Sequence, residues 1–321
     1  MFIDFSSAFN TIQPHLLIPK LCDMGVNNCL SLWILEFLTN RPQYVSLMSN
    51  DSTFKSHLIV TNTGAPQGTV LAPVLFSIYT NNCTTTFDNI PIIKYADDTS
   101  IQALITTDND LINYKHEIKR FVKWCEDHYL LLNIKKTKEM IFDFRLKDNT
   151  HDNVCIHGQQ VETVSEYKYL GVVFDDKLEW SQNSDRIQKK INQRLFFMKR
   201  LYTFNVDKTL LGLFYDSCIA SLFCFCINAW GGNISAKDKH KINQVIKRSN
   251  KLIDSLVYKT LDDWLLMSSK RTLSRILKDT THPLHSAIKR SPRSGRVLHA
   301  TVKTERHLNS FLPYAIRNYT S

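Results

Sequence analysis

Tyr95-Ala96-Asp97-Asp98 is a carboxylate doublet between two apolar runs, Ile90-Pro91-Ile92-Ile93-Lys94 and Ile101-Gln102-Ala103-Leu104-Ile105. Apolar runs on both sides of a short polar break predict a strand, a tight turn and a second strand, with the acids at the turn. Two carboxylates held this close repel each other unless a cation lies between them. The doublet therefore indicates either a magnesium site for phosphoryl chemistry or a plain β-hairpin whose turn uses Asp, a residue that turns favour.

A third acid, Asp4, follows Phe2-Ile3 and precedes the small polar pair Ser6-Ser7. An acid at the end of a strand, with small polar residues opening a helix, can present its carboxylate beside Asp97 and Asp98. The alternative is that Asp4 is a helix N-cap, a position at which Asp is preferred.

A loop-forming segment lies between these acids: Thr63-Gly64-Ala65-Pro66-Gln67-Gly68-Thr69, followed by the apolar residues 70–76. Two glycines and a proline set a loop whose backbone can approach a ligand, and the apolar run predicts a helix after it. The alternative is an ordinary junction between a loop and a helix.

The composition is that of a folded chain. Its 321 residues are 43% hydrophobic and 11% aromatic, enough to bury the core of one large domain or two smaller ones. The eight cysteines include no CxxC pair and no His at zinc spacing, which indicates reduced thiols rather than a disulfide framework. Because Asp4 interrupts the start, no signal peptide is visible. We expect an intracellular protein of the nucleus or the cytoplasm, and nothing in the sequence specifies an oligomeric state.

The charge is divided unevenly along the chain. Residues 1–182 hold 15 Lys and Arg against 21 Asp and Glu, a balance of −6, whereas residues 183–321 hold 25 against 9, a balance of +16. A strongly positive half suits nucleic acid or an anionic membrane. The one membrane-like run, residues 210–230, is interrupted by Asp216 and Asn228 and is better explained as a buried helix. We therefore expect nucleic acid, and no membrane, as the partner.

Periodicity divides the chain into a mixed half and a helical half. Residues 111–130 predict a helix, residues 154–180 predict strands that turn at His157-Gly158, and the segment from 183 onward predicts helices. The expected apolar faces of the first two helices are Ile187, Ile191, Leu195 and Met198, then Leu211, Phe214, Cys218 and Leu222. Ser235 is expected to cap a third helix whose outer face carries Lys237, Lys241, Lys247 and Lys251. The tail from Thr281 is expected to be irregular, and the domain boundary is expected near residue 182.

Taken together and in this order, these segments resemble the reverse transcriptases of non-LTR (LINE-type) retrotransposons, most closely the Jockey-like group. The matching segments are residues 4–12 for motif A, residues 64–76 around Pro66-Gln67-Gly68 for motif B, residues 95–98 for motif C, Leu132-Asn133-Ile134-Lys135-Lys136-Thr137-Lys138-Glu139 for motif D, and Tyr167-Lys168-Tyr169-Leu170-Gly171 for the primer-grip motif E. Downstream, Ala229-Trp230-Gly231 and His282-Pro283-Leu284-His285 are similar to the thumb and tail of that group. The resemblance covers nearly the whole chain.

The resemblance implies an α+β fold: a right-hand polymerase palm, with an antiparallel sheet and packed helices, over residues 1–182. A mostly helical, basic thumb and a C-terminal extension would follow over residues 183–321. It also implies an RNA-directed DNA polymerase that uses two Mg²⁺ ions, with Mn²⁺ as a possible substitute. The metal ligands would be Asp4, Asp97 and Asp98, with Asp98 the least direct of the three, and the carbonyl of Phe5 would add a ligand.

The resemblance further implies substrate roles for several residues. Phe9 would be the steric gate that selects deoxynucleotides, unless it is simply part of the core, and Gln67 and Gly68 would shape the nucleotide pocket. Lys136, ahead of Lys135 and Lys138, would protonate the pyrophosphate. Primer-binding residues would be Tyr95, Tyr169, Leu170 and Gly171. The implied partners are an RNA template, a DNA primer and deoxynucleoside triphosphates.

The chain departs from the family at its start, since only Met1-Phe2-Ile3 precede Asp4. Complete members carry an endonuclease and a fingers subdomain before motif A, so we expect an N-terminally truncated copy with doubtful activity of its own. We also expect the short strand before Asp4 to support that carboxylate poorly. The alternative function is a catalytically silent retroelement remnant that only binds nucleic acid.

Overall fold

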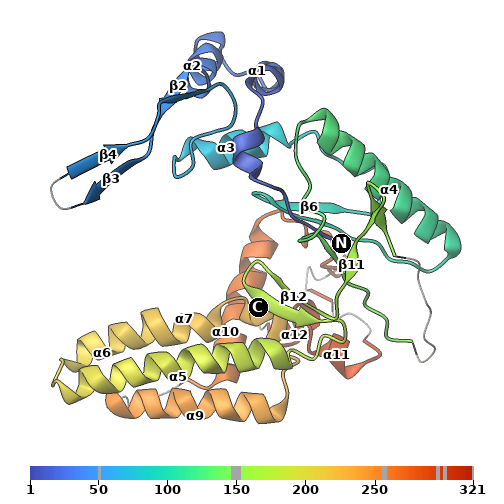
Figure 1. Ribbon diagram of the computed structural model, residues 1–321. Coiled ribbons are helices and arrows are strands. Elements are labelled where there is room, and N and C mark those ends of the chain that lie inside the picture. Colours follow the sequence, from blue (N-terminus) through green and yellow to red (C-terminus); the bar gives the residue numbers. More distant parts are fainter. Residues whose placement is uncertain (50–51, 146–152, 255–258, 294–296, 299–301, 320–321) are drawn as a thin grey trace. The chain divides into compact units, whose positions relative to one another are not determined.

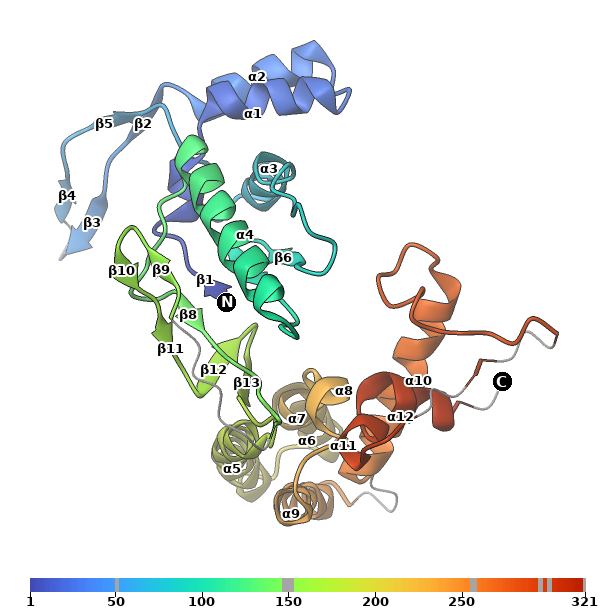
Figure 2. The same ribbon diagram turned by 90° about the vertical axis from the view of Figure 1, so that its right-hand side faces the viewer.

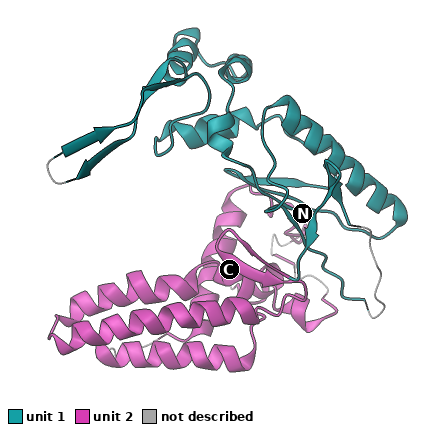
Figure 3. Cartoon of the chain, in the orientation of Figure 1, with its two compact units in different colours: residues 1–165 teal, residues 166–321 magenta. Residues whose placement is uncertain are grey.

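The computed structural model (Figure 1) describes residues 1–49, 52–145, 153–254, 259–293, 297–298 and 302–319. They form two compact units, Met1–Ser165 and Glu166–Ser321 (Figure 3). The boundary expected near residue 182 thus falls inside unit 2. The reason is local: a hairpin of strands β12 (Glu166–Tyr169) and β13 (Val172–Asp175) packs against helix α5 (Ser181–Thr203) and belongs with it. Each unit is described by itself.

Unit 1 combines short strands with five helical segments among its described residues. Its strands are β1 (Phe2–Ile3), β2 (Arg41–Gln43), β3 (Ser46–Ser49), β4 (Ser52–Lys55), β5 (Ile59–Thr61), β6 (Ile92–Tyr95), β7 (Asp98–Ile101), β8 (Lys138–Glu139), β9 (Cys155–Ile156), β10 (Gln159–Gln160) and β11 (Glu162–Thr163). Its helices are a 3₁₀ turn (Ala8–Thr11), α1 (Pro14–Asp23), α2 (Asn28–Leu38), α3 (Leu71–Tyr79) and α4 (Asp108–Asp127).

A five-stranded sheet forms the centre of unit 1, in the order β11-β8-β1-β7-β6. All its pairs are antiparallel except β11 with β8, so the expected antiparallel sheet has one parallel edge pair. β1 lies in the middle, with Phe2 opposite both Ser100 of β7 and Lys138 of β8. The predicted hairpin is confirmed, because β6 and β7 pair through Tyr95 and Asp98 around a turn in which Ala96 has φ 54°.

Alternation along these strands gives the sheet two faces, one of which packs against helices. Ile3 of β1 and Ile101 of β7 are buried with Phe76 of α3 and Phe121 of α4, so α3 and α4 cover one face of the sheet (Figure 2). Side chains two residues apart share a face. The opposite face therefore carries the positions of Asp4, Tyr95 and Asp98.

The predicted helix over residues 111–130 is confirmed as α4, which begins three residues earlier. The reason is a capping box: the Thr107 hydroxyl accepts from the Asp110 N–H, and the Asp110 carboxylate accepts from the Thr107 N–H. The helix ends at Asp127, three residues before the predicted end, and Tyr129 beyond it is exposed.

Unit 2 is mostly helical after its opening hairpin. Its further elements are α6 (Lys208–Phe214), a π-helix (Tyr215–Ala220), α7 (Ser221–Cys224), α8 (Ile227–Trp230), α9 (Ala236–Leu252), α10 (Leu261–Lys278), α11 (Glu305–Leu308) and α12 (Phe311–Arg317). The expected apolar face of α5 is confirmed, since Ile187, Ile191, Leu195 and Met198 are all buried.

The expected face of the next helix is only partly right, because Phe214 and Leu222 are half-buried against the core and are not its most buried residues. The buried residues are Tyr215, Ile219 and Phe223, each one position later than the predicted Phe214, Cys218 and Leu222. The buried residues follow steps of four from Leu211, whereas the prediction took a first step of three, to Phe214. One face of a helix accepts steps of three or four residues, and the sequence alone does not choose between them.

Residues Lys208–Trp230 are the one helical stretch of the described chain that is long and apolar enough, by composition, to cross a membrane. A core helix passes the same criterion. Leu211, Ile219 and Trp230 of this stretch are fully buried in the core of unit 2.

The tail is more regular than expected. α12 packs on α10 through a small cluster in which Ile276 and Ala315 are almost completely buried. The prediction of an irregular tail is therefore wrong for residues 305–317, because proline at the third position of α12 is compatible with a first helical turn.

Candidate active site

Asp4 and Asp98 are placed side by side by the strand register. Ile3 of β1 lies opposite Thr99 of β7, and one further step along this antiparallel pair brings Asp4 next to Asp98. Asp98 is the first residue of β7 and Asp97 is in the turn before it, both exposed. The structure thus brings the three predicted acids to one end of two adjacent strands.

The backbone N–H and the backbone carbonyl of Asp4 are both hydrogen-bonded to one segment, residues 133–137. Its N–H donates to the Thr137 hydroxyl at 3.3 Å, and its carbonyl accepts from the Asn133 N–H at 2.9 Å. Phe5 then forms a β-bridge with Leu132. The expectation that Asp4 is poorly supported is therefore wrong, because the segment matched to motif D pairs with it directly.

Asp4 is also not a helix N-cap. The 3₁₀ turn begins after Ser7 and α1 begins after Gln13. The alternative role for Asp4 is thereby removed, and its half-buried carboxylate is left for another use.

The electrostatics of the doublet reflect crowded negative charge. Partial burial, together with the charges of Asp97 and Asp4, raises the pKa of Asp98 above its ordinary value. Over the described residues, no three His, Cys, Asp or Glu side chains converge closely enough to form a ready-made metal cage. The donors themselves fit magnesium, which prefers carboxylate oxygens and binds through few protein ligands.

The glycine-containing loop locks onto the segment after Asp4. The Gly64 N–H donates to the Ile12 carbonyl at 2.7 Å, and the Ala65 N–H donates to the Phe9 carbonyl at 2.8 Å. Gly64 has φ 74°, a left-handed conformation that suits glycine. The loop continues into α3, so the predicted helix after it is confirmed.

Gln67 and Gly68 lie at the outer side of this loop. The Gln67 side-chain amide donates to the Asn10 amide oxygen at 3.5 Å, and Gly68 has φ 84° with open space around its Cα. Motif A and motif B residues thus meet through Asn10.

Arg41 is a functional candidate that the sequence reasoning missed. Its guanidinium donates to the carbonyls of Thr63 at 2.6 Å and Gly64 at 2.8 Å, and also to the Leu38 carbonyl. No local pattern signals this contact, because its partners lie 22 and 23 residues further along the chain.

The aromatic candidates have different surroundings. Phe9 is half-buried, with its ring 5.0 Å from that of Phe76, which leaves both the gate role and the core role open. Phe5 is half-buried and lies 6.4 Å from Phe121. Tyr95 is 68% exposed, on the same sheet face as Asp98.

The three candidate lysines of residues 135–138 are not equivalent. Lys138 donates to the Lys135 carbonyl at 2.7 Å and pairs with Glu162 across β8 and β11. Lys136 and Lys135 are exposed. This difference favours Lys136 or Lys135 over Lys138 for a role at the site.

The motif E residues belong to unit 2, as the turn of the β12–β13 hairpin. Leu170 and Gly171 have φ 45° and 88°, and a Cβ on Gly171 would lie 3.0 Å from the Phe225 ring. Tyr169 precedes this turn. Primer binding by Tyr169, Leu170 and Gly171 stays a prediction.

The basic face of α9 is narrower than expected. Lys237, Lys247 and Lys251 are exposed, as predicted. Lys241, also predicted on the outer face, is half-buried, and its Nζ lies 3.1 Å from a carboxylate oxygen of Asp238 and 3.8 Å from one of Asp185. Ser235 caps α9, as predicted, by accepting from the Asp238 N–H.

Comparisons with known proteins centre on one family. A family model described as "Reverse transcriptase (RNA-dependent DNA polymerase)" matches residues 1–174. A model described as the N-terminal part of alkylated DNA repair protein alkB homolog 8 matches residues 180–221.

Similar curated proteins include the RNA-directed DNA polymerase from mobile element jockey of Drosophila melanogaster, 26% identical over 74% of this chain and 26% of that protein. The probable RNA-directed DNA polymerase from transposon BS, also of Drosophila melanogaster, is 24% identical over 77% of this chain and 28% of that protein. The chain thus spans about a quarter of the length of these curated relatives.

Among solved structures, telomerase from Candida tropicalis matches 89% of this chain and 52% of its own, with 12% identity and a TM-score of 0.36. Telomerase from Candida albicans, solved with a fragment of telomeric RNA, matches 89% and 49% with 12% identity and a TM-score of 0.30. TM-scores this low carry no conclusion about the fold.

Proposed function

Because this chain belongs to the reverse transcriptase family, we propose that it is the palm and thumb of an RNA-directed DNA polymerase from a non-LTR retrotransposon. The observation that carries the proposal is the register of β1 on β7, which brings Asp4 beside Asp98 and next to Asp97. In this proposal, residues 1–182 form the palm and residues 183–321 the basic thumb and C-terminal region.

The proposed cofactor is Mg²⁺, as two ions held by Asp4, Asp97 and Asp98. Such ions activate a primer hydroxyl and neutralise the leaving pyrophosphate. The chain supplies carboxylate oxygens, and the backbone N–H and carbonyl of Asp4 are both hydrogen-bonded to neighbouring residues. Bound ions would also relieve the repulsion from Asp97 and Asp4 that, together with partial burial, raises the pKa of Asp98.

The substrates would be a DNA primer on an RNA template, with deoxynucleoside triphosphates. Phe9 lies beside the loop of Gln67 and Gly68, so a nucleotide sugar would be bounded by that ring. An exposed Lys136 can donate a proton to the pyrophosphate. The exposed ring of Tyr95 is available for the primer end.

The second candidate is a catalytically silent protein that only binds nucleic acid. The observation in its favour is the positive balance of residues 183–321, together with exposed Lys237, Lys247 and Lys251 on α9. Phosphate contacts by such side chains need no metal and no catalytic acid.

Metal binding separates the two candidates. We expect Mn²⁺ titrated into the purified chain to bind weakly in calorimetry and Asp97→Asn to lose that binding, because this change removes a charge with little change of shape. Asp88→Asn replaces an exposed acid elsewhere in unit 1 and should bind like the wild type.

Full Mn²⁺ affinity in Asp97→Asn would overturn the metal assignment. A wild-type chain that binds a primed RNA template but no Mn²⁺ would support the silent candidate. Primer extension that depends on Asp97 would establish the polymerase directly.

A further inference from the structure

We propose that Lys94 is a positioning residue for the turn that carries Asp97 and Asp98, which it fixes by tying β6 to the end of α3. This inference rests on the proposed function, because only that function makes the position of Asp97 and Asp98 important for metal binding. The geometry of Lys94 itself does not depend on it.

Lys94 points away from the acids. It lies opposite Thr99 across the β6–β7 pair, and residues opposite each other share a face of the sheet. Thr99 is 3% exposed, on the face that α3 and α4 cover. Tyr95 and Asp98, the next pair, face the other way. Lys94 is thus directly adjacent to the turn but reaches behind the sheet.

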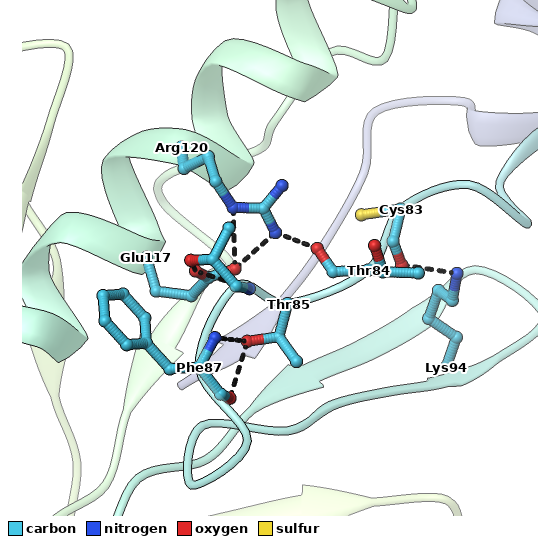
Figure 4. Close-up of polar contacts among 8 residues, drawn as sticks. Cys83, Thr84, Thr85, Phe87, Lys94, Glu117 and Arg120 are labelled. Atoms are coloured by element: carbon cyan, nitrogen blue, oxygen red, sulfur yellow. Dashed lines mark hydrogen bonds and ion pairs between the residues drawn. The ribbon is translucent and has the colours of Figure 1, made fainter.

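The Lys94 ammonium bonds two backbone carbonyls where α3 ends. It donates to the Thr80 carbonyl at 2.6 Å and to the Cys83 carbonyl at 3.0 Å (Figure 4 shows the Cys83 contact). Lys20 of α1 donates nearby, to the Tyr79 carbonyl and to Asn82. Carbonyls at a helix C-terminus lack helical partners and carry partial negative charge, so they attract cations.

The segment that receives Lys94 is itself fixed by α4. Arg120 donates to the Thr84 carbonyl and to Glu117, whose side chain is completely buried (Figure 4). Glu117 also accepts from the Thr86 hydroxyl at 2.7 Å. Residues 83–86 are therefore hydrogen-bonded both to Lys94 of β6 and to side chains of α4, so Lys94 ties the hairpin to a segment that α4 also holds.

This arrangement is costly for a purely structural contact. Burial lowers the pKa of Lys94, and no carboxylate of the described residues lies within ion-pair distance of its ammonium. Removing an ammonium from water without a carboxylate partner costs free energy that an apolar side chain would avoid. What the ammonium adds, and an apolar side chain lacks, is a directional attachment to two carbonyls.

The test uses the whole 321-residue chain at a temperature where every variant is folded. Amide hydrogen exchange of residues 92–101 and the Kd for Mn²⁺ by calorimetry are measured for the wild type, Lys94→Met and Lys94→Arg. Lys119→Met, at an exposed lysine of α4, is the matched control.

We expect Lys94→Met to exchange faster over residues 92–101 and to bind Mn²⁺ about tenfold more weakly, the usual scale for a residue that orients metal ligands. Lys94→Arg keeps a cation with several donors and should retain most of both properties. Lys119→Met should equal the wild type. If Lys94→Met does not fold, Lys94→Gln, whose shorter amide cannot reach both carbonyls, replaces it under the same criteria.

Wild-type exchange and Mn²⁺ affinity in Lys94→Met would overturn the proposal, as would equal impairment in Lys94→Met and Lys94→Arg. If the wild type itself binds no Mn²⁺, the proposed function fails, and hydrogen exchange alone decides the role of Lys94. Unchanged protection of residues 92–101 in Lys94→Met then overturns it.

Discussion

Gly64 packs so closely on Asn10 that a Cβ added to Gly64 would lie 2.6 Å from the Asn10 Cα. This contact joins the loop before α3 to the segment that follows Asp4. Only glycine meets both of its requirements, a left-handed backbone and space for a neighbouring main chain.

We therefore predict that Gly64→Ala lowers the free energy of unfolding by about 2–4 kcal/mol, since the left-handed conformation and the backbone clash each contribute. Gly68→Ala is the matched control, because Gly68 has φ 84° but nothing within 4 Å of an added Cβ. The free energy of unfolding of Gly68→Ala should fall by only about 1–2 kcal/mol. Urea unfolding of both variants measures the difference, and equal losses would contradict the close approach at Asn10.

Sugar selection is the second prediction. If Phe9 is the gate, Phe9→Val should raise ribonucleotide relative to deoxynucleotide incorporation by more than about tenfold, or about 1.4 kcal/mol of discrimination. Phe37→Val shortens another half-buried ring of the same core and should leave selectivity unchanged. The measurement is competitive primer extension. A loss of stability in Phe9→Val without a change in selectivity would assign Phe9 to the core.

The third prediction concerns pH and Glu117. Burial alone would raise its pKa, but hydrogen bonds from Arg120 and Thr86 outweigh burial and hold the pKa of Glu117 below its ordinary value near 4.5. A lowered acid pKa stabilises the fold above the ordinary value, and this stability is lost as the pH falls through the folded-state pKa.

Glu117→Gln should accordingly lower the free energy of unfolding by about 1–3 kcal/mol at pH 7, and the gap to the wild type should narrow below about pH 4.5. Glu126→Gln, at an exposed position of the same helix, should change it by less than about 0.5 kcal/mol at either pH. Denaturant unfolding across pH 3–7 is the measurement. If the difference in unfolding free energy between the wild type and Glu117→Gln grows as the pH falls, the lowered pKa of Glu117 is contradicted.

The fourth prediction concerns salt. Binding of the chain to RNA or DNA of any sequence should weaken steeply as salt rises, because phosphate contacts release counterions. Replacing Lys237, Lys247 and Lys251 together by Gln should reduce the slope of log K against log salt by up to about 2–3. Lys119→Gln serves as the control in α4. Filter binding over a salt series measures the slopes, and equal slopes would exclude α9 from the contact.

Local patterns predicted much of the site. The apolar runs on both sides of residues 95–98 were sufficient to predict the β6–β7 hairpin. The glycines at positions 64 and 68 predicted a loop, and this loop does approach another backbone at Asn10. Both signals are carried by neighbours in sequence. The contacts of Arg41 and Lys94 could not be predicted in this way, because each side chain bonds carbonyls 11 or more residues away that any residue could supply.

Two errors have equally physical causes. The apolar face predicted from Leu211 took a step of three residues to Phe214, whereas the most buried side chain of that turn is Tyr215, a step of four. Asp4 was expected to be weakly held because only its own short strand was considered, whereas Asn133 and Thr137 bond its backbone across the sheet. Support for a strand comes from its neighbours, which the sequence does not place.

The central place of β1 also sets an order of assembly during translation. Phe2 pairs with Ser100 and Lys138, so its first neighbour is made roughly a hundred residues after it. At about 5–20 residues per second, β1 waits roughly 5–20 s on the ribosome before β7 emerges, and longer for β8. Until β7 is available, Phe2 and Ile3 of β1 have neither of the strands with which they pair in the folded sheet. Unit 1 can therefore close only late, and nascent chains that stop before residue 138 cannot complete the middle of their own sheet.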